Sequence, residues 1–154
     1  MTSRERQEIL REKLRGDFAK LEKAVASLRY SHEKCRAIIA RARYSEEDLE
    51  ALDSLTSRFA RISDMYTQRV LVTVLQLLGE DAPSLIDRLN VCEKAGIIHS
   101  ALEMKNIRDL RNRVAHEYLD EELHTLVAEI MEAAPVLLDE IAITKLALEK
   151  REYL

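Results

Sequence analysis

Residues 10–28 read LREKLRGDFAKLEKAVASL. Large apolar side chains recur there at steps of four, four, three, four and three residues, at Leu10, Leu14, Phe18, Leu21, Val25 and Leu28. An α-helix turns once every 3.6 residues, so this spacing places them along one side of a helix. The pattern predicts a first helix that extends to about Arg43, either unbroken or interrupted near Tyr30.

The composition agrees with a helical protein. The chain has 154 residues, of which 47% are hydrophobic and 34% are charged, and it contains only three glycines and two prolines. This length supports a single domain, residues 1–154, with a core of its own. The net charge of −4 excludes a general nucleic-acid binder, so any contact with nucleic acid must be local.

Capping signals divide the rest of the chain. Ser45 with Asp48, and Ser100 with Glu103, have the spacing of capping boxes that open helices. The expected further helices run from residue 45 to the glycine at 79, from about 85 to the glycine at 96, from 100 through the motif below, and from about Asp120 onward. We therefore predict an all-α, up-and-down bundle of about five helices.

Several features indicate a cytoplasmic protein without a membrane segment. Cys35 and Cys92 lie far apart and form no CxxC pair, which is typical of reduced thiols. The first residues are charged and lack an apolar signal core. The longest apolar run, residues 70–78, is too short to cross a bilayer.

One stretch carries chemistry that a plain bundle does not need. Residues 111–118 read RNRVAHEY and place Arg111, Asn112, His116 and Tyr118 within two turns. A histidine can take or give a proton near neutral pH, and an arginine presents a planar fork of donors that matches a phosphate. Together with an amide that orients either partner, these groups can cleave RNA through its own 2′-hydroxyl without a metal.

The spacing sets a geometric condition. Arg111 and His116 are five residues apart, which on a straight helix is about 140° around the axis. The two side chains cannot then meet one small target. Either the helix bends or ends between them, or a second copy of the chain supplies part of the site.

Local charge and neighbouring residues extend this candidate site. Between residues 103 and 116, the cations face only two acids, Glu103 and Asp109; the cations are Lys105, Arg108, Arg111 and Arg113. Doubled across a dimer axis, they would form a basic groove for RNA. Asp64 and Tyr66, midway along the second helix, are expected as polar neighbours. No metal-ligand pattern or cofactor motif occurs, and we expect neither metal nor cofactor.

The stretch RNRVAHEY resembles the R-x4-H-x-Y motif of the HEPN superfamily, in the branch of HepT-like toxins. The Asn after the Arg and the small residue before the His belong to the resemblance. The order of helices is also similar over about residues 5–148, so the chain is expected to be one HEPN-like helical domain.

The resemblance implies a metal-independent endoribonuclease, a toxin of a type II or type VII toxin–antitoxin system, that acts on mRNA or tRNA as a two-fold homodimer. By this resemblance Arg111 stabilises the scissile phosphate, His116 is the acid or base, and Asn112 orients one of them. Tyr118 corresponds to a tyrosine that a partner nucleotidyltransferase antitoxin modifies with AMP.

Two other interpretations remain open. The chain could be a non-catalytic helical adaptor that binds a small nucleotidyltransferase, although such proteins often lack the Arg and the His. It could also be a helical dimerisation module in which the motif is only a salt-bridge cluster and Tyr118 only packs in the core.

Overall fold

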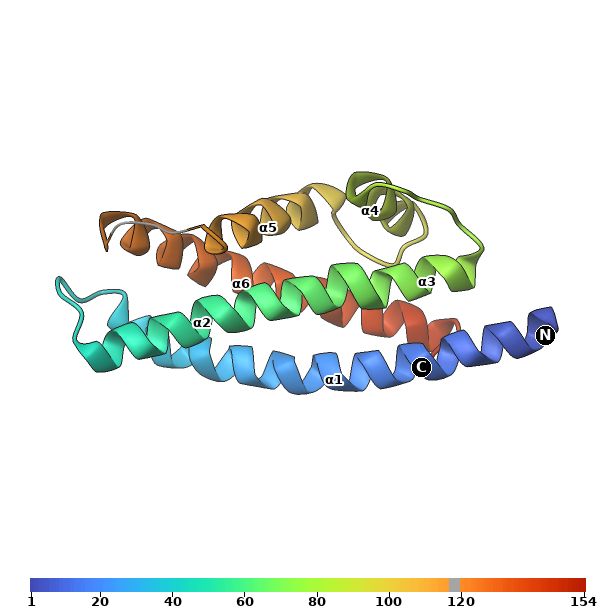
Figure 1. Ribbon diagram of the computed structural model, residues 1–154, viewed down its shortest axis with the longest axis horizontal. Coiled ribbons are helices and arrows are strands. Elements are labelled where there is room, and N and C mark those ends of the chain that lie inside the picture. The colour runs from blue at the N-terminus through green and yellow to red at the C-terminus, as the bar shows by residue number, and fades with distance from the viewer. Residues whose placement is uncertain (117–119) are drawn as a thin grey trace.

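The structure, a computed structural model, describes residues 1–116 and 120–154, except for the side chains of Asp120 and Glu121. Its elements are α1 (Ser3–Ile38), α2 (Glu46–Met65), a π-helical turn η1 (Tyr66–Val70), α3 (Leu71–Leu78), α4 (Leu85–Lys94), α5 (Ala101–Val114) and α6 (Asp120–Lys150). Since α2, η1 and α3 follow one another without a break, they form one rod, and the described chain makes five rods (Figure 1). The predicted all-α bundle of about five helices is confirmed, and the described residues contain no strand.

The longest helices surround a shared core. The α2–α3 rod lies alongside α1 and runs in the opposite direction, while α6 packs on both α1 and α2 (Figure 1). The short helix α4 and the motif helix α5 cover the other side of the rod. The buried residues are mainly Leu, Ile and Val, with Phe59 and Tyr66 as fully buried aromatic rings.

Among the described residues, no helix combines the length and the apolarity that crossing a bilayer requires.

The first helix is continuous but shorter than expected. It does not break near Tyr30, and Gly16 lies exposed within it. The expected extension to about Arg43 is wrong, because α1 ends at Ile38. The residues that follow, 40–43, carry no large apolar side chain that a further turn could bury.

The second helix contains a π turn that the periodicity did not predict. The Thr67 hydroxyl donates to the backbone oxygen of Ser63 at 2.7 Å, one turn earlier. From Tyr66 to Val70 the backbone has the wider hydrogen-bonding pattern of a π-helix. The widened turn adds one residue between the halves of the rod. Gly79 then ends α3 with a positive φ of 71°, as expected for a glycine that terminates a helix.

A buried carboxylate from α6 fixes the start of the motif helix α5. Glu140 is only 1% exposed, and its two oxygens accept hydrogen bonds from the backbone N–H groups of His99 at 2.8 Å and Ser100 at 2.9 Å. Glu93 accepts from the N–H of Ala101 at 2.7 Å. These amides have no partner within the helix, so the carboxylates satisfy groups that would otherwise be buried without a bond.

The capping signals are confirmed at one helix and half confirmed at the other. At Ser45 and Asp48 both reciprocal bonds form. The Ser100 hydroxyl accepts from the N–H of Glu103 at 3.1 Å, but Glu103 does not return the bond, because Glu140 already occupies the N–H of Ser100.

Glu140→Ala should lower the free energy of unfolding by about 2–4 kcal/mol, because two backbone N–H groups at the start of α5 lose their charged acceptor. Urea denaturation followed by circular dichroism measures this loss. Glu132→Ala, an exposed acid on the same helix, is the matched control and should change stability by less than about 0.5 kcal/mol. Equal losses in the two variants would contradict the capping role of Glu140.

Candidate active site

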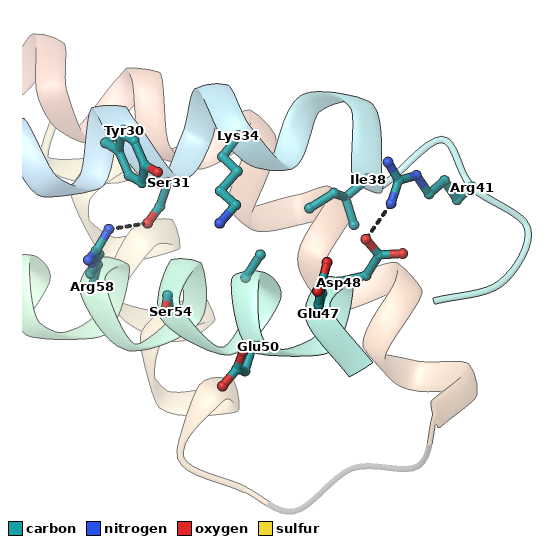
Figure 2. Close-up of a pocket in the computed structure, with 11 residues that line it drawn as sticks. Tyr30, Ser31, Lys34, Ile38, Arg41, Glu47, Asp48, Glu50, Ser54 and Arg58 are labelled. Atoms are coloured by element: carbon teal, nitrogen blue, oxygen red, sulfur yellow. Dashed lines mark hydrogen bonds and ion pairs between the residues drawn. The ribbon is translucent and has the colours of Figure 1, made fainter. Parts of the chain in front are cut away.

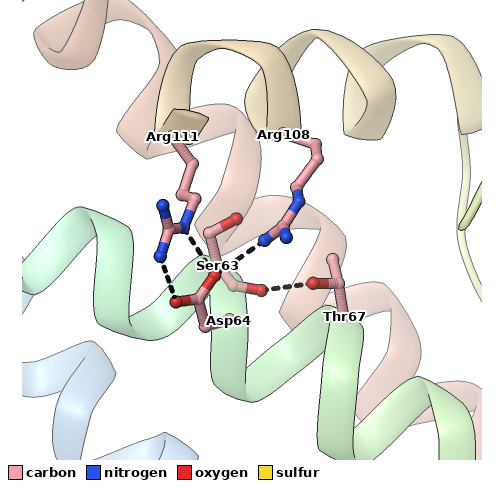
Figure 3. A network of polar contacts seen from close by, with 5 residues as sticks. All are labelled: Ser63, Asp64, Thr67, Arg108 and Arg111. Carbon is pink, nitrogen blue, oxygen red and sulfur yellow. Dashed lines mark hydrogen bonds and ion pairs between the residues drawn. The ribbon is translucent and has the colours of Figure 1, made fainter. Parts of the chain in front are cut away.

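The predicted site lies where α5 passes α2 (Figure 3). Arg111 donates to Asp64 from Nε at 2.7 Å and from Nη2 at 2.8 Å. Arg108 donates to the same carboxylate from Nη1 at 2.7 Å. One acid on α2 therefore holds two arginines of α5, and the contact between Asp64 and the motif arginine is bidentate.

Gln68 completes this group. In the amide orientation that satisfies both partners, its side-chain oxygen accepts from Arg108 Nη2 at 2.9 Å and Nη1 at 3.2 Å. Asp64 and Gln68 are four residues apart on the α2–α3 rod and therefore share one face of it. Arg108 and Arg111 are three residues apart and share the facing side of α5. We call these four residues the Asp64 cluster.

The three charged members of the cluster are half-buried. The exposed fractions of their side chains are 32% for Asp64, 21% for Arg108 and 24% for Arg111. The arginines lower the pKa of the Asp64 carboxyl, chiefly through the hydrogen bonds from Arg111, while burial acts in the opposite direction. Charge-assisted bonds in this setting are stronger than exposed ion pairs, so the cluster holds the Arg111 side chain in place.

Arg111 nevertheless keeps donors for a ligand. A guanidinium has five N–H donors, and the edge that faces Asp64 uses two of them. The other edge is formed by Nη1 and Nη2. Its Nη1 group donates no hydrogen bond to any described residue. Asp64 can therefore fix the plane of the guanidinium while the other edge binds an anion such as a phosphate.

The motif helix ends between Arg111 and His116. Helix α5 stops at Val114, and the N–H groups of Ala115 and His116 donate to carbonyls only three residues back, at 3.2 Å each. His116 therefore follows a tightened last turn and does not continue the helix. The helix therefore ends between Arg111 and His116, which is the first of the two geometric alternatives. A site shared with a second copy of the chain stays a prediction.

Asn112 and His116 are both exposed, and their side chains make no hydrogen bond to a described residue. An exposed imidazole is accessible to substrate and to solvent protons. Tyr118, the residue expected to accept AMP, lies outside the described residues.

The cations expected to form a basic groove are paired with acids. Lys105 forms an ion pair with Asp109 at 3.1 Å, and Arg113 forms one with Glu129 of α6 at 2.6 Å. Arg108 is held in the Asp64 cluster. Sequence spacing missed the acids on the other helices, so the region is closer to neutral than the expected groove.

Of the two expected neighbours, Asp64 contacts the site and Tyr66 does not. Tyr66 is fully buried, and its hydroxyl donates to the hydroxyl oxygen of Thr144, which itself donates to the backbone oxygen of Ile97 at 2.8 Å. Burial raises the pKa of this phenol strongly, so it stays protonated. The expectation that Tyr66 belongs to the site is wrong, because its side of the rod faces α6 in the core.

A polar groove of about 640 Å³ lies elsewhere, between the end of α1 and the start of α2 (Figure 2). Two of its cations have partners: Arg41 pairs with Asp48, and Arg58 donates to the Ser31 hydroxyl at 2.6 Å. Three cations and three acids line it, which leaves no net charge to select a ligand. In the described part of the chain, no group of three or more His, Cys, Asp or Glu side chains is placed to hold a metal ion.

Comparison with protein families identifies the class of protein. The family model of HepT-like ribonucleases matches residues 42–143, about two thirds of the chain. The match begins after α1, so it is shorter at the N-terminal end than the resemblance over residues 5–148, and it contains the Asp64 cluster and the whole motif. Comparisons with curated proteins and with solved structures gave no match.

The chain therefore belongs to the HepT-like ribonuclease family, which is consistent with the HEPN superfamily. Membership indicates ribonuclease activity in general and RNA as the class of substrate.

Asp64→Asn should lower the free energy of unfolding by about 1–2 kcal/mol at pH 7, because both arginines lose a charged acceptor. The pKa of Asp64 is lower in the folded protein than the value of about 3.9 in an unfolded chain. Its stabilising contribution is therefore complete above that unfolded value and is lost as pH falls through the folded pKa. The difference between wild type and variant should stay constant from pH 7 to about 5 and shrink near pH 3 in urea titrations.

The matched control is Asp53→Asn, an exposed acid on the same helix, which should change stability little at any pH. A loss in Asp64→Asn that is the same at pH 3 and pH 7 would show that packing, and not the carboxylate charge, is responsible.

Proposed function

We propose that the protein is a metal-independent endoribonuclease, the toxin of a type II or type VII toxin–antitoxin system, which acts on mRNA or tRNA in the cytoplasm. The observation that carries this proposal is the arrangement of the motif in a HepT-like ribonuclease chain. Asp64 holds Arg111 by one edge, and His116 is exposed just beyond the end of the same helix.

The proposed reaction is an internal transesterification. The 2′-oxygen of RNA forms a bond to the adjacent phosphorus as the bond from phosphorus to the 5′-oxygen breaks. His116 accepts the proton of the 2′-hydroxyl, and an acid gives a proton to the leaving 5′-oxygen. The products are a 2′,3′-cyclic phosphate and a 5′-hydroxyl. Arg111 stabilises the negative charge of the phosphorane, and Asn112 orients the imidazole or the phosphate.

This chemistry motivates a homodimer with the two motifs at one cleft. One imidazole cannot accept and donate a proton at the same instant. A two-fold axis beside the motif would supply a second His116 as the acid. The exposure of His116 and Asn112 leaves both side chains available to such a cleft.

The paired cations suggest different roles. Lys105 and Arg113 are in exposed ion pairs, which are weak enough for RNA phosphates to replace the carboxylates. Arg108 is half-buried and binds Asp64 and Gln68, so we assign it to positioning Asp64 and not to RNA contact. Arg111 keeps its bond to Asp64 during the reaction.

The proposed partner is a nucleotidyltransferase antitoxin that transfers AMP to Tyr118. The attached phosphodiester would be bulky and anionic, and it would lie two residues from His116 in sequence. It would block the cleft and repel the RNA backbone.

RNA cleavage should persist in EDTA and leave 2′,3′-cyclic phosphate ends, because the attacking oxygen comes from the RNA. His116→Ala should reduce cleavage by about 10²–10⁴-fold, the usual contribution of a general acid or base. Arg111→Lys should cause a similar loss, since lysine keeps the charge but cannot bind Asp64 and a phosphate by two edges. Mass spectrometry of the cleaved ends and a fluorescent RNA assay measure these effects.

The control for His116→Ala is His99→Ala, an exposed histidine near the other end of α5. Cleavage that requires added magnesium, or that acts equally on DNA, would overturn the mechanism. The adaptor interpretation requires that wild type be inactive as well. The salt-bridge interpretation requires that activity fall only in proportion to melting temperature.

Tyr118→Phe should retain most cleavage but escape neutralisation, because it keeps the ring and loses the hydroxyl that would receive AMP. Cells that express the variant beside its nucleotidyltransferase should stop growing, while cells with wild-type toxin should recover. Intact-mass measurement should show added AMP on the wild type only. Equal neutralisation of both proteins would mean that the antitoxin acts without modifying Tyr118.

A further inference from the structure

The outer face of α6 exposes two large apolar side chains close together. Ile143 is 37% exposed and Leu146 is 61% exposed. The other large apolar side chains exposed on the described surface, such as Ile86 and Leu102, are isolated in sequence from one another. A pair of exposed apolar side chains one helical turn apart marks a contact surface more than a single one does.

These residues belong to a narrow stripe with charged ends. Asp139, Ile143, Leu146 and Lys150 follow one another at steps of four, three and four, which keeps them within about 60° around the helix axis. All four are exposed, whereas Ile141, Thr144 and Leu148 on the opposite side are buried. We call the four exposed residues the α6 stripe. Its spacing is that of helices that pair along a seam.

We propose that the α6 stripe is an interface between two copies of this chain, which pair there in antiparallel orientation about a two-fold axis. In that register Ile143 lies opposite Leu146 of the second copy, and Asp139 lies opposite Lys150 of the second copy. The same two contacts recur on the other side of the axis, as an isologous interface requires.

The opposite charges at the two ends of the stripe favour a second copy of the chain in antiparallel orientation. Neither Asp139 nor Lys150 forms an ion pair with a described residue of its own chain. A parallel pair would place each charge against its like, whereas the antiparallel pair places opposite charges together twice. Ala142 and Ala147 flank the stripe, and their small side chains allow two helix backbones to approach.

The surroundings leave room for a second copy. Part of the stripe lines an open groove of about 460 Å³, which α6 forms with the turn that follows α4. Its lining is apolar except for two cations at one end of α6, so it can receive apolar side chains; the lining residues are Ala95, Gly96, Ile143, Leu146, Ala147, Lys150 and Arg151. Two large apolar residues per copy are few for a stable interface, which buries about 800 Å² on each partner, so the association is of the weak class.

This interface is separate from the proposed dimer at the motif. The end of α5 lies beside α6 at Glu129, through its ion pair with Arg113, and the stripe begins ten residues further along. Ten residues of helix span about 15 Å. Pairing at the stripe therefore leaves the two motifs apart, and a chain that uses both interfaces forms tetramers or longer assemblies.

Charge exchange tests the proposal on the full-length protein. Asp139→Lys and Lys150→Asp should each weaken self-association by about tenfold or more, because two attractive pairs become two repulsive ones. The double variant should return to within about threefold of wild type. Sedimentation velocity from about 5 to 500 µM at low salt measures this, with circular dichroism to verify folding.

General charge effects are controlled within the same set. Asp139→Lys moves the net charge from −4 to −2 and Lys150→Asp moves it to −6, so non-specific repulsion would change association in opposite directions. Leu146→Asp should weaken association, and Leu102→Asp, at a similarly exposed leucine on α5, should not.

The outcomes separate this inference from the proposed function. A wild-type tetramer that single exchanges convert to an RNA-cleaving dimer supports the stripe beside a motif dimer. A wild-type dimer that single exchanges convert to a monomer supports the stripe and contradicts pairing at the motif. Single exchanges without effect, or a double variant that fails to restore association, overturn the stripe and leave the ribonuclease proposal untouched.

Discussion

The contact of Glu140 with the first residues of α5 determines where the motif lies. Helix α5 has 14 residues and is therefore about 21 Å long, so a fixed beginning largely fixes the position of its far end. The carboxylate binds two backbone N–H groups where the positive end of the helix dipole also favours an anion. The Thr144 hydroxyl, which donates to the carbonyl of Ile97 at 2.8 Å, joins the same turn to α6.

The Asp64 cluster is the second restraint on α5, and it acts next to the chemistry. With one end bound to α6 and the other bound to α2, the helix has little freedom to rotate. After the cluster, Asn112 and His116 are exposed, and the helix stops at Val114. Arg111 is held in place, whereas the side chains of Asn112 and His116 make no hydrogen bond to a described residue. The motif therefore combines a positioned guanidinium with accessible polar groups.

The sequence predicted the helices well because each obeys local rules: apolar spacing, a side-chain cap at Ser45, and glycine at residue 79. Features that depend on other elements were missed. The π turn coincides with a hydrogen bond from the Thr67 hydroxyl to the carbonyl of Ser63, and the spacing of apolar residues does not reveal it. Asp64 was expected near the site and Tyr66 with it, but residues two apart on a helix face different ways. The partners Glu140, Glu129 and Gln68 come from distant segments, so spacing along the motif could not reveal them.

The way the cations are paired is consistent with the proposed site for RNA on an acidic chain. Exposed pairs such as Lys105 with Asp109 contribute about 0–1 kcal/mol, so a phosphate can take the place of the acid at little cost. The bidentate pair of Arg111 with Asp64 is half-buried, and releasing it would leave Asp64 without its strongest partner. In the proposed function, the cations that would exchange partners are thus distinguished from Arg111, which would stay in place. A net charge of −4 would then disfavour unspecific binding of nucleic acid elsewhere on the surface, while the bond to Asp64 keeps Arg111 oriented.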